Sequence, residues 1–299
     1  MNKSTYKKFL PAFIFILLFI SNIQNLEAQS GQFIQFWGGP QYVGMLNFND
    51  NNTIATTASN GSVTFTGEEI TDETYRWGGG IDYINNFTQN YGYQTGIYYS
   101  GQGQKYEGYV KDFNNPGDSL LTHYHSQVTM DYIRIPFMFR FNSILDEGDR
   151  INISIFMGLQ AGYLISITST TSPETTPEAI LEKYKNFNLM QLYNAIDFGL
   201  GAGAQFNVRL TEKLSANLGL RFDRSIVSIE NHSFVLPDDA PVEYLFPLST
   251  MKSERVSHDD ITVRPATQNI SVNAYLGLSI KLKNGKPPKP HPTDDLPPE

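Results

Sequence analysis

The most constraining feature of this sequence is an alternation of apolar with polar or small residues that continues for about three times the length of an ordinary strand. The odd positions from Ile151 to Ile167 read IIIMLAYII, and the even positions from Asn152 to Ser166 read NSFGQGLS. Successive side chains of a β-strand point to opposite faces, so this pattern predicts one strand with an apolar face and a polar or small face. Ordinary strands have about five or six residues.

The same alternation recurs along the chain, so the sequence predicts an all-β protein with eight strands. It is clearest in the last four segments, and the three segments before them alternate less strictly. The first segment is rich in glycine and does not reveal which face is apolar. The predicted strands are residues 33–48, 75–84, 91–100, 132–141, 151–167, 192–208, 214–223 and 270–282.

The connections between these segments alternate between long and short. Long polar stretches cover residues 49–74, 103–126, 169–190 and 230–267, and short links cover residues 86–90, 143–149 and 210–213. Outer membrane barrels have short periplasmic turns, long outer loops and both termini in the periplasm. The pattern therefore predicts an eight-stranded antiparallel up-and-down transmembrane β-barrel over residues 29–283, closed because open strand edges are not tolerated in lipid.

A soluble barrel of lipocalin type, or a β-sandwich, fits the alternation of each strand equally well, because periodicity does not tell inside from outside. Three features favour the membrane barrel: the strand lengths, the order of the connections, and the positions of the glycines. Seven glycines fall on the charged face, which suits a crowded barrel interior. They are Gly158, Gly162, Gly199, Gly201, Gly203, Gly219 and Gly277.

The composition excludes several classes of function. Aromatic residues make up 13% of the chain and charged residues 17%, against about 25% charged in soluble domains. The net charge of -8 lacks the basic excess that nucleic-acid binding requires. The chain has no cysteine, which excludes disulfides, thiolate metal sites and thiol nucleophiles.

The two ends of the chain differ from the predicted barrel. Residues 1–28 are typical of a signal peptide, with three early lysines, an apolar run over residues 9–20 and a small residue at Ala28. That apolar run is shorter than the roughly 20 residues that span a bilayer. Residues 284–299 are rich in proline and predict an extended or disordered periplasmic tail that reaches toward the cell wall or a partner.

Charged residues on the polar face predict a network inside the barrel. Eight strands enclose a space just wide enough for side chains to fill it, and buried charges require partners. We therefore expect these residues to plug the interior and fix the strand register, because an ion-selective ring would require a wider pore. The predicted lumenal residues are Arg76, Asp82, Arg134, Arg140, Asp197, Arg221, Asp223 and Lys281.

Several local patterns resemble catalytic, metal or nucleotide sites, but a plainer interpretation fits each better. The glycines from Gly199 to Ala204 match a dinucleotide motif, which must open a helix, whereas here the strand pattern continues. His123 with His125, and Glu254 with the sequence His258-Asp259-Asp260, offer metal ligands on polar loops without a complete set. A rim catalytic site with Ser126 and Asp131 would need a geometry that spacing does not establish. We expect no catalytic, cofactor or metal site.

Three motifs carry a resemblance to a known family. These are Tyr93–Gly103 (YQTGIYYSGQG), Tyr132–Pro136 (YIRIP) and Asp197–Gly203 (DFGLGAG). In this order and spacing the chain resembles the PorT-like, porin-family outer membrane β-barrels of the Bacteroidota. The family pattern has an acidic residue where Arg134 stands, and many outer membrane barrels end on an aromatic residue, whereas this chain continues into its Pro-rich tail.

The resemblance implies a location in the cell outer membrane, with the lipid bilayer and the barrel assembly machinery as partners. It also implies an accessory role in a secretion or gliding apparatus. The residues themselves predict a non-enzymatic barrel with a plugged lumen, in which the long extracellular loops give a structural or binding role. A small-solute porin is a third alternative, and a secretion-system or cell-wall partner is compatible with the tail.

Overall fold

The computed structural model describes residues 31–47, 70–72, 74–88, 90–111, 121–143, 150–172, 188–231 and 267–283. The predicted signal peptide (1–28) and tail (284–299) lie outside these residues, as do Glu254 and the sequence His258-Asp259-Asp260. The side chains of His123, His125 and Ser126 are also not described. Among the described residues, no helix is long and apolar enough to span a bilayer.

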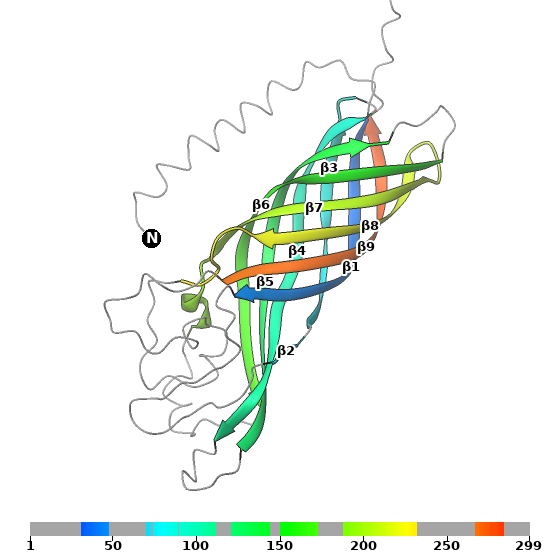
Figure 1. Ribbon diagram of the computed structural model, residues 1–299. Coiled ribbons are helices and arrows are strands. Elements are labelled where there is room, and N and C mark those ends of the chain that lie inside the picture. Colours follow the sequence, from blue (N-terminus) through cyan, green and yellow to red (C-terminus); the bar gives the residue numbers. More distant parts are fainter. Residues whose placement is uncertain are drawn as a thin grey trace, which may run out of the picture.

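Eight long strands form a closed antiparallel barrel in which each strand pairs with its neighbour in the chain (Figure 1). The ring is closed by pairing of the first strand with the last, as Tyr42 opposite Val272 illustrates. A ninth, short strand, β2, pairs only with β4. The strands are β1 (Gln32–Asn47), β2 (Ile70–Asp72), β3 (Thr74–Asn86), β4 (Tyr91–Lys111), β5 (Leu121–Asn142), β6 (Ile151–Ser172), β7 (Ile196–Arg209), β8 (Leu214–Ser225) and β9 (Thr267–Lys283). The predicted eight-stranded up-and-down barrel is confirmed.

The apolar face of the strands points outward. Leu218 is 56% exposed and Ile155 is 54% exposed, whereas Gln35 and Asp197 are fully buried. This arrangement is the reverse of a soluble barrel, which buries its apolar face, and it suits a wall surrounded by hydrocarbon. The structure therefore excludes the lipocalin-like alternative.

The structure assigns the faces of the glycine-rich first strand. Gln35, Trp37 and Gln41 point inward and are buried, whereas Phe36 and Tyr42 are exposed on the outside. The Trp37 ring packs between the rings of Tyr98 and Tyr275, with centroids 5.4 and 5.2 Å away. Trp37 is thus an interior aromatic residue, which the local sequence pattern does not reveal.

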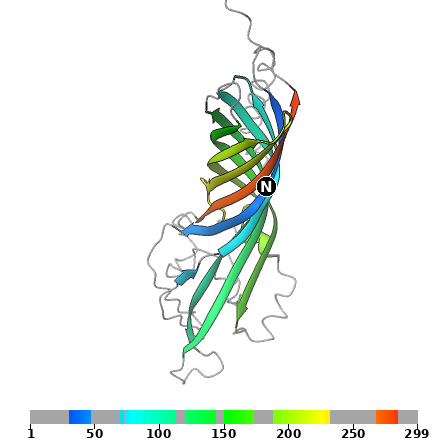
Figure 2. The same cartoon turned by 90° about the vertical axis from the view of Figure 1, so that its right-hand side faces the viewer.

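The prediction of a loop over residues 103–126 is wrong. β4 continues to Lys111 and β5 begins at Leu121, and these two residues are paired across the hairpin. Figures 1 and 2 show the hairpin extending past the ends of β1 and β9. Beyond the membrane a strand needs no apolar face, so its sequence loses the alternation on which the prediction relied.

The predicted start of the sixth strand, at Leu192, is also wrong. Residues Leu189–Leu192 form a short 3₁₀ helix, η2, and β7 begins at Ile196. The Asn188 side chain caps η2 by accepting a hydrogen bond from the Met190 N–H at 3.0 Å. Leu192, which the alternation placed on the outer face, is instead buried. Residues 192–194 lie outside the strand, so their match to the two-residue alternation is a coincidence.

Candidate functional site: the barrel interior

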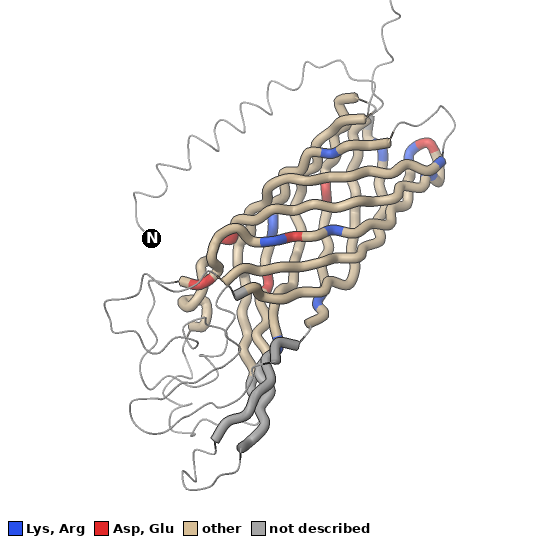
Figure 3. Tube along the Cα trace, in the orientation of Figure 1, with Lys and Arg blue, Asp and Glu red and all other residues tan. Residues whose placement is uncertain are grey.

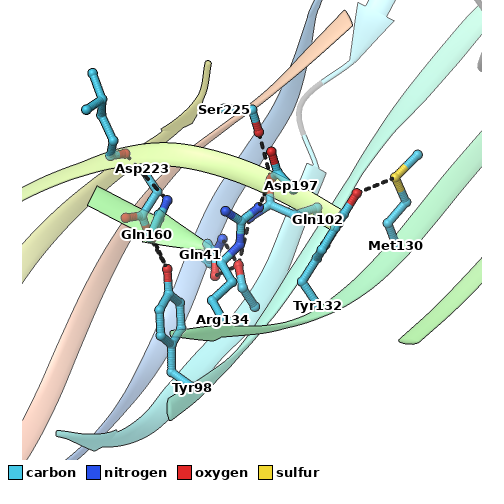
Figure 4. A network of polar contacts seen from close by, with 12 residues as sticks. Gln41, Tyr98, Gln102, Met130, Tyr132, Arg134, Gln160, Asp197, Asp223 and Ser225 are labelled. Carbon is cyan, nitrogen blue, oxygen red and sulfur yellow. Dashed lines mark hydrogen bonds and ion pairs between the residues drawn. The ribbon is translucent and has the colours of Figure 1, made fainter. Parts of the chain in front are cut away.

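The best-buried ion pair in the interior joins β5 to β7. Arg134 Nη2 donates to Asp197 Oδ2 at 2.8 Å, and both side chains are 1% exposed. Ser225 Oγ, from β8, donates to the same carboxylate oxygen at 2.8 Å. Figure 4 shows these three side chains converging inside the barrel. Asp197 is therefore the acidic partner of Arg134.

A second group of polar contacts crosses the interior between opposite walls. Arg221, on β8, is paired with Asp223 at 3.0 Å. Its Nη2 also donates to Tyr98 Oη of β4 at 2.8 Å and to Gln160 Oε1 of β6 at 3.0 Å. The Arg221 guanidinium carbon lies 4.1 Å from the centre of the Tyr98 ring. One arginine thus links three strands that are not neighbours in the sheet.

Gln94 connects the remaining two interior charges, which do not contact each other directly. Its Nε2 donates to Asp82 Oδ2 at 2.8 Å, and its Oε1 accepts from Arg140 Nη1 at 2.9 Å. Arg140 further donates to Asn142 Oδ1 at 3.0 Å and to Ser154 Oγ at 2.8 Å. The Gln94 side-chain amide therefore bridges the Asp82 carboxylate and the Arg140 guanidinium through hydrogen bonds.

Arg76 and Lys281 lie toward the two ends of the barrel. Arg76 pairs with Asp131 at 2.7 Å, and about a quarter of each side chain is exposed. The Tyr99 hydroxyl donates to the same Asp131 oxygen at 2.5 Å. Lys281 lies at the opposite end of the barrel, where it lines a cavity. The eight predicted residues therefore fall into separate groups according to their height along the strands.

An apolar cluster at the long-loop end of the interior was missed by the sequence reasoning. Its buried members are Met45, Val128, Met130, Tyr132, Leu164, Leu192, Tyr193 and Ile229. They come from β1, β5, β6 and η2, and from the residues that follow η2 and β8. The sequence contained a signal for this cluster. Four apolar residues stand at positions where the alternation directs side chains inward: Val128, Met130, Tyr132 and Leu164.

The dinucleotide-like pattern has a clear structural outcome. The segment from Gly199 to Ala204 lies wholly within β7 and opens no helix, so the context of a dinucleotide motif is missing. In the part of the chain that the structure describes, no group of three or more His, Cys, Asp or Glu residues could hold a metal ion. Asp131 is engaged by Arg76 and Tyr99.

Comparison with known proteins gives the family. Residues 29–231 match the family described as "Outer membrane protein beta-barrel domain". The chain belongs to this family. As a member it is an outer membrane β-barrel protein and lies in the bilayer of the outer membrane. No curated protein matches the sequence.

Solved outer membrane proteins are also similar to the chain, at low identity. OprG from Pseudomonas aeruginosa is 11% identical with a TM-score of 0.36, and the match covers 86% of this chain and 98% of OprG. Neisserial surface protein A is 10% identical with a TM-score of 0.36, covering 85% and 98%. Ail of Yersinia pestis is 8% identical with a TM-score of 0.32, covering 84% and 99%.

Proposed function

We propose that this chain is a non-enzymatic, non-conducting outer membrane barrel that acts as a structural or binding protein through its extracellular end. The observation that carries the proposal is the contact of Arg221 with both Tyr98 and Gln160 across the interior. Side chains from opposite walls meet there, at a height where a solute would have to pass. The apolar cluster around Met130 and Leu192 adds a second layer nearer the long-loop end.

Conductance in a planar bilayer tests the absence of a pore. We expect the refolded wild-type barrel to give no stepwise conductance, because side chains that meet across an eight-stranded interior would block a continuous aqueous path. The triple variant Tyr98→Ala/Arg221→Ala/Asp223→Ala removes a bulky ring and both members of a charge pair, and it serves as the matched control. Discrete channels in the wild-type protein would contradict the proposal and favour the small-solute porin.

The extracellular end offers an extended surface for recognition. In barrels of this kind the long connections face outward from the cell, and recognition residues concentrate on such connections. The β4–β5 hairpin continues in register from Gly101 opposite Asp131 to Lys111 opposite Leu121. β2 adds a third strand at Ile70 to Asp72, paired with Lys105 to Glu107. A small sheet thus projects beyond the rim.

A shortened hairpin tests the binding role. In this variant a two-residue turn joins Lys105 to Gln127, which removes the projecting part but leaves the barrel strands intact. Wild-type and shortened proteins are used to capture partners from detergent-solubilised outer membranes. We expect a partner that the wild type retains to be lost by the variant, while the variant keeps the heat-modifiable gel migration of a folded barrel. Equal retention by both proteins would contradict a role for the hairpin.

The PorT-like secretion accessory is the alternative, and it rests on the resemblance of the motifs at Tyr93–Gly103 and Tyr132–Pro136. Deletion of the gene separates the two proposals. A block in protein secretion would favour the accessory role, whereas normal secretion would favour the binding barrel.

A further inference from the structure

The short-turn end of the interior opens into a cavity of about 210 Å³, and the described residues that line it are more often basic than acidic. Five basic residues line it, and among the described residues Glu212 is its one carboxylate. Figure 3 shows Lys and Arg gathered at this end of the barrel. The basic residues come from three strands and from the ends of two turns; they are Arg140, Arg150, Arg209, Lys213 and Lys281.

Arg140 forms the deepest cationic part of this cavity. Its side chain is 4% exposed, and its three hydrogen-bond acceptors are the neutral groups of Gln94, Asn142 and Ser154. The other two buried arginines, Arg134 and Arg221, each contact a carboxylate within 3.0 Å. Burial of a cation without an anionic partner is costly. Arg140 is therefore placed to gain from an anion that enters the cavity.

The floor of the cavity is a lattice of neutral amides and hydroxyls. Asn207 Nδ2 donates to Ser154 Oγ at 2.9 Å, and Asn217 Nδ2 donates to Asn207 Oδ1 at 2.8 Å. Asn217 also contacts Ser279 Oγ at 3.1 Å, which joins the lattice to β9. Because these side chains hold one another in place, the floor is preorganised and adds polar groups without adding negative charge.

The rim of the cavity supplies further cations. Among the described residues, no carboxylate lies within ion-pair distance of Arg150, Lys213 or Lys281. Lys281 is half-buried, and Arg150 and Lys213 are exposed at the edge. Cations on several sides of one small cavity strengthen the local positive potential.

We infer that this cavity is a binding site for a phosphate group presented from the periplasmic side. The short turns and both termini of such barrels face the periplasm, so the cavity opens toward that compartment. Arginine and lysine at the rim would contact phosphate oxygens, which accept charge-assisted hydrogen bonds well. The inference goes beyond the extracellular binding role and does not depend on it, because the two surfaces lie at opposite ends of the barrel.

Titration of the folded, full-length mature protein with inorganic phosphate tests the site, with calorimetry in an uncharged maltoside detergent. We expect saturable binding, and about tenfold weaker binding for Lys281→Gln and for Arg150→Gln, because each loses one charge-assisted contact. Neither residue takes part in the hydrogen-bonded floor, so both variants should fold. Lys105→Gln removes a lysine at the opposite end and should bind phosphate as the wild type does.

Three results would overturn the inference. The first is a wild-type protein that binds no phosphate at millimolar concentration, and the second is unchanged affinity in both rim variants. The third concerns the β5–β6 turn. The β5–β6 turn carries Asp146, Glu147 and Asp149, which lie outside the described residues. Binding that appears only after these three are changed to Asn would show that the native chain neutralises its own cavity, which also contradicts the site.

A second arm identifies the source of the phosphate group. The titration is repeated in nanodiscs of phosphatidylcholine with and without phosphatidylglycerol. Weaker apparent binding of inorganic phosphate in the discs with phosphatidylglycerol would identify a lipid headgroup as the occupant. Equal binding in both discs would identify a free phosphate group. Both results support the site.

Discussion

Arg134 and Asp197 form an ion pair across a glycine. The two residues lie on β5 and β7, and Gly162 of β6 is aligned with both of them in the sheet. A Cβ at Gly162 would lie 3.3 Å from Arg134 Cγ and 3.6 Å from Asp197 Cβ. The absence of a side chain at this position thus leaves the space through which the two charges meet at 2.8 Å. The pair fixes three adjacent strands at one height.

Removing one member of this pair should destabilise the barrel strongly. In Arg134→Gln, Asp197 stays buried without its cation, and we expect the free energy of unfolding to fall by about 3–5 kcal/mol. Equilibrium unfolding in urea with lipid vesicles measures the change. The double variant Arg134→Met/Asp197→Leu leaves no unpaired charge. Its free energy of unfolding should therefore fall by less than that of Arg134→Gln. A single variant as stable as the wild type would show that the pair contributes nothing to folding.

A charge on the outer wall should hinder membrane insertion. Leu218 lies near the middle of β8 and is exposed on the outside, so Leu218→Arg should cost about 2–4 kcal/mol near the bilayer midplane. The readouts are the yield of inserted protein and the heat-modifiable gel migration. Thr211→Arg, in the β7–β8 turn, is the matched control and should insert normally. Normal insertion of Leu218→Arg would mean that this face does not contact hydrocarbon.

A methyl group at Gly219 should clash with an interior ring. Gly219 is paired with Tyr275 of β9, and a Cβ there would lie 2.8 Å from Cε1 of that ring. We expect Gly219→Ala to lower the free energy of unfolding by about 1–3 kcal/mol through overpacking. Gly44→Ala is the control, because its Cβ would meet only the Ile270 side chain, at 3.7 Å.

A double-mutant cycle isolates this contact. Combining Gly219→Ala with Tyr275→Leu should lower the free energy of unfolding by less than the sum of the two single changes, since leucine at position 275 leaves room for the new methyl group. Additive costs would indicate that Gly219 is required for a reason other than the approach of the ring.

The strand number, the closed up-and-down order and the outward direction of the apolar face could all be predicted from the sequence. These properties depend on a two-residue period and on connection lengths, which are local and repeat in every strand. Ile151 to Ile167 is the clearest case, because a membrane-spanning wall must keep one face apolar over its whole height. The same alternation places Arg134, Arg140 and Asp197 on the polar face of their strands.

The extension of β4 and β5 past the rim could not be predicted in this way. Lys111 and Leu121 lie where no hydrocarbon requires an apolar face, so their pairing leaves no periodic signal. The apolar cluster around Met130 and Leu192 was missed for a different reason, although four of its members are apolar residues of inward parity. Its members come from segments far apart in the chain, and only the tertiary structure brings them to one end of the barrel.

Outside the first strand and residues 192–194, the sequence by itself determined which residues share a face, because alternation is a property of each strand taken alone. Only the tertiary structure decided which inward residues meet. Arg134 reaches Asp197 because register and Gly162 place them at one height. Arg140 contacts neutral groups, and Lys281 lines a basic cavity, because closure of the ring sets the height of each position around the barrel. Register and closure are properties of the assembled sheet, and no single strand contains them.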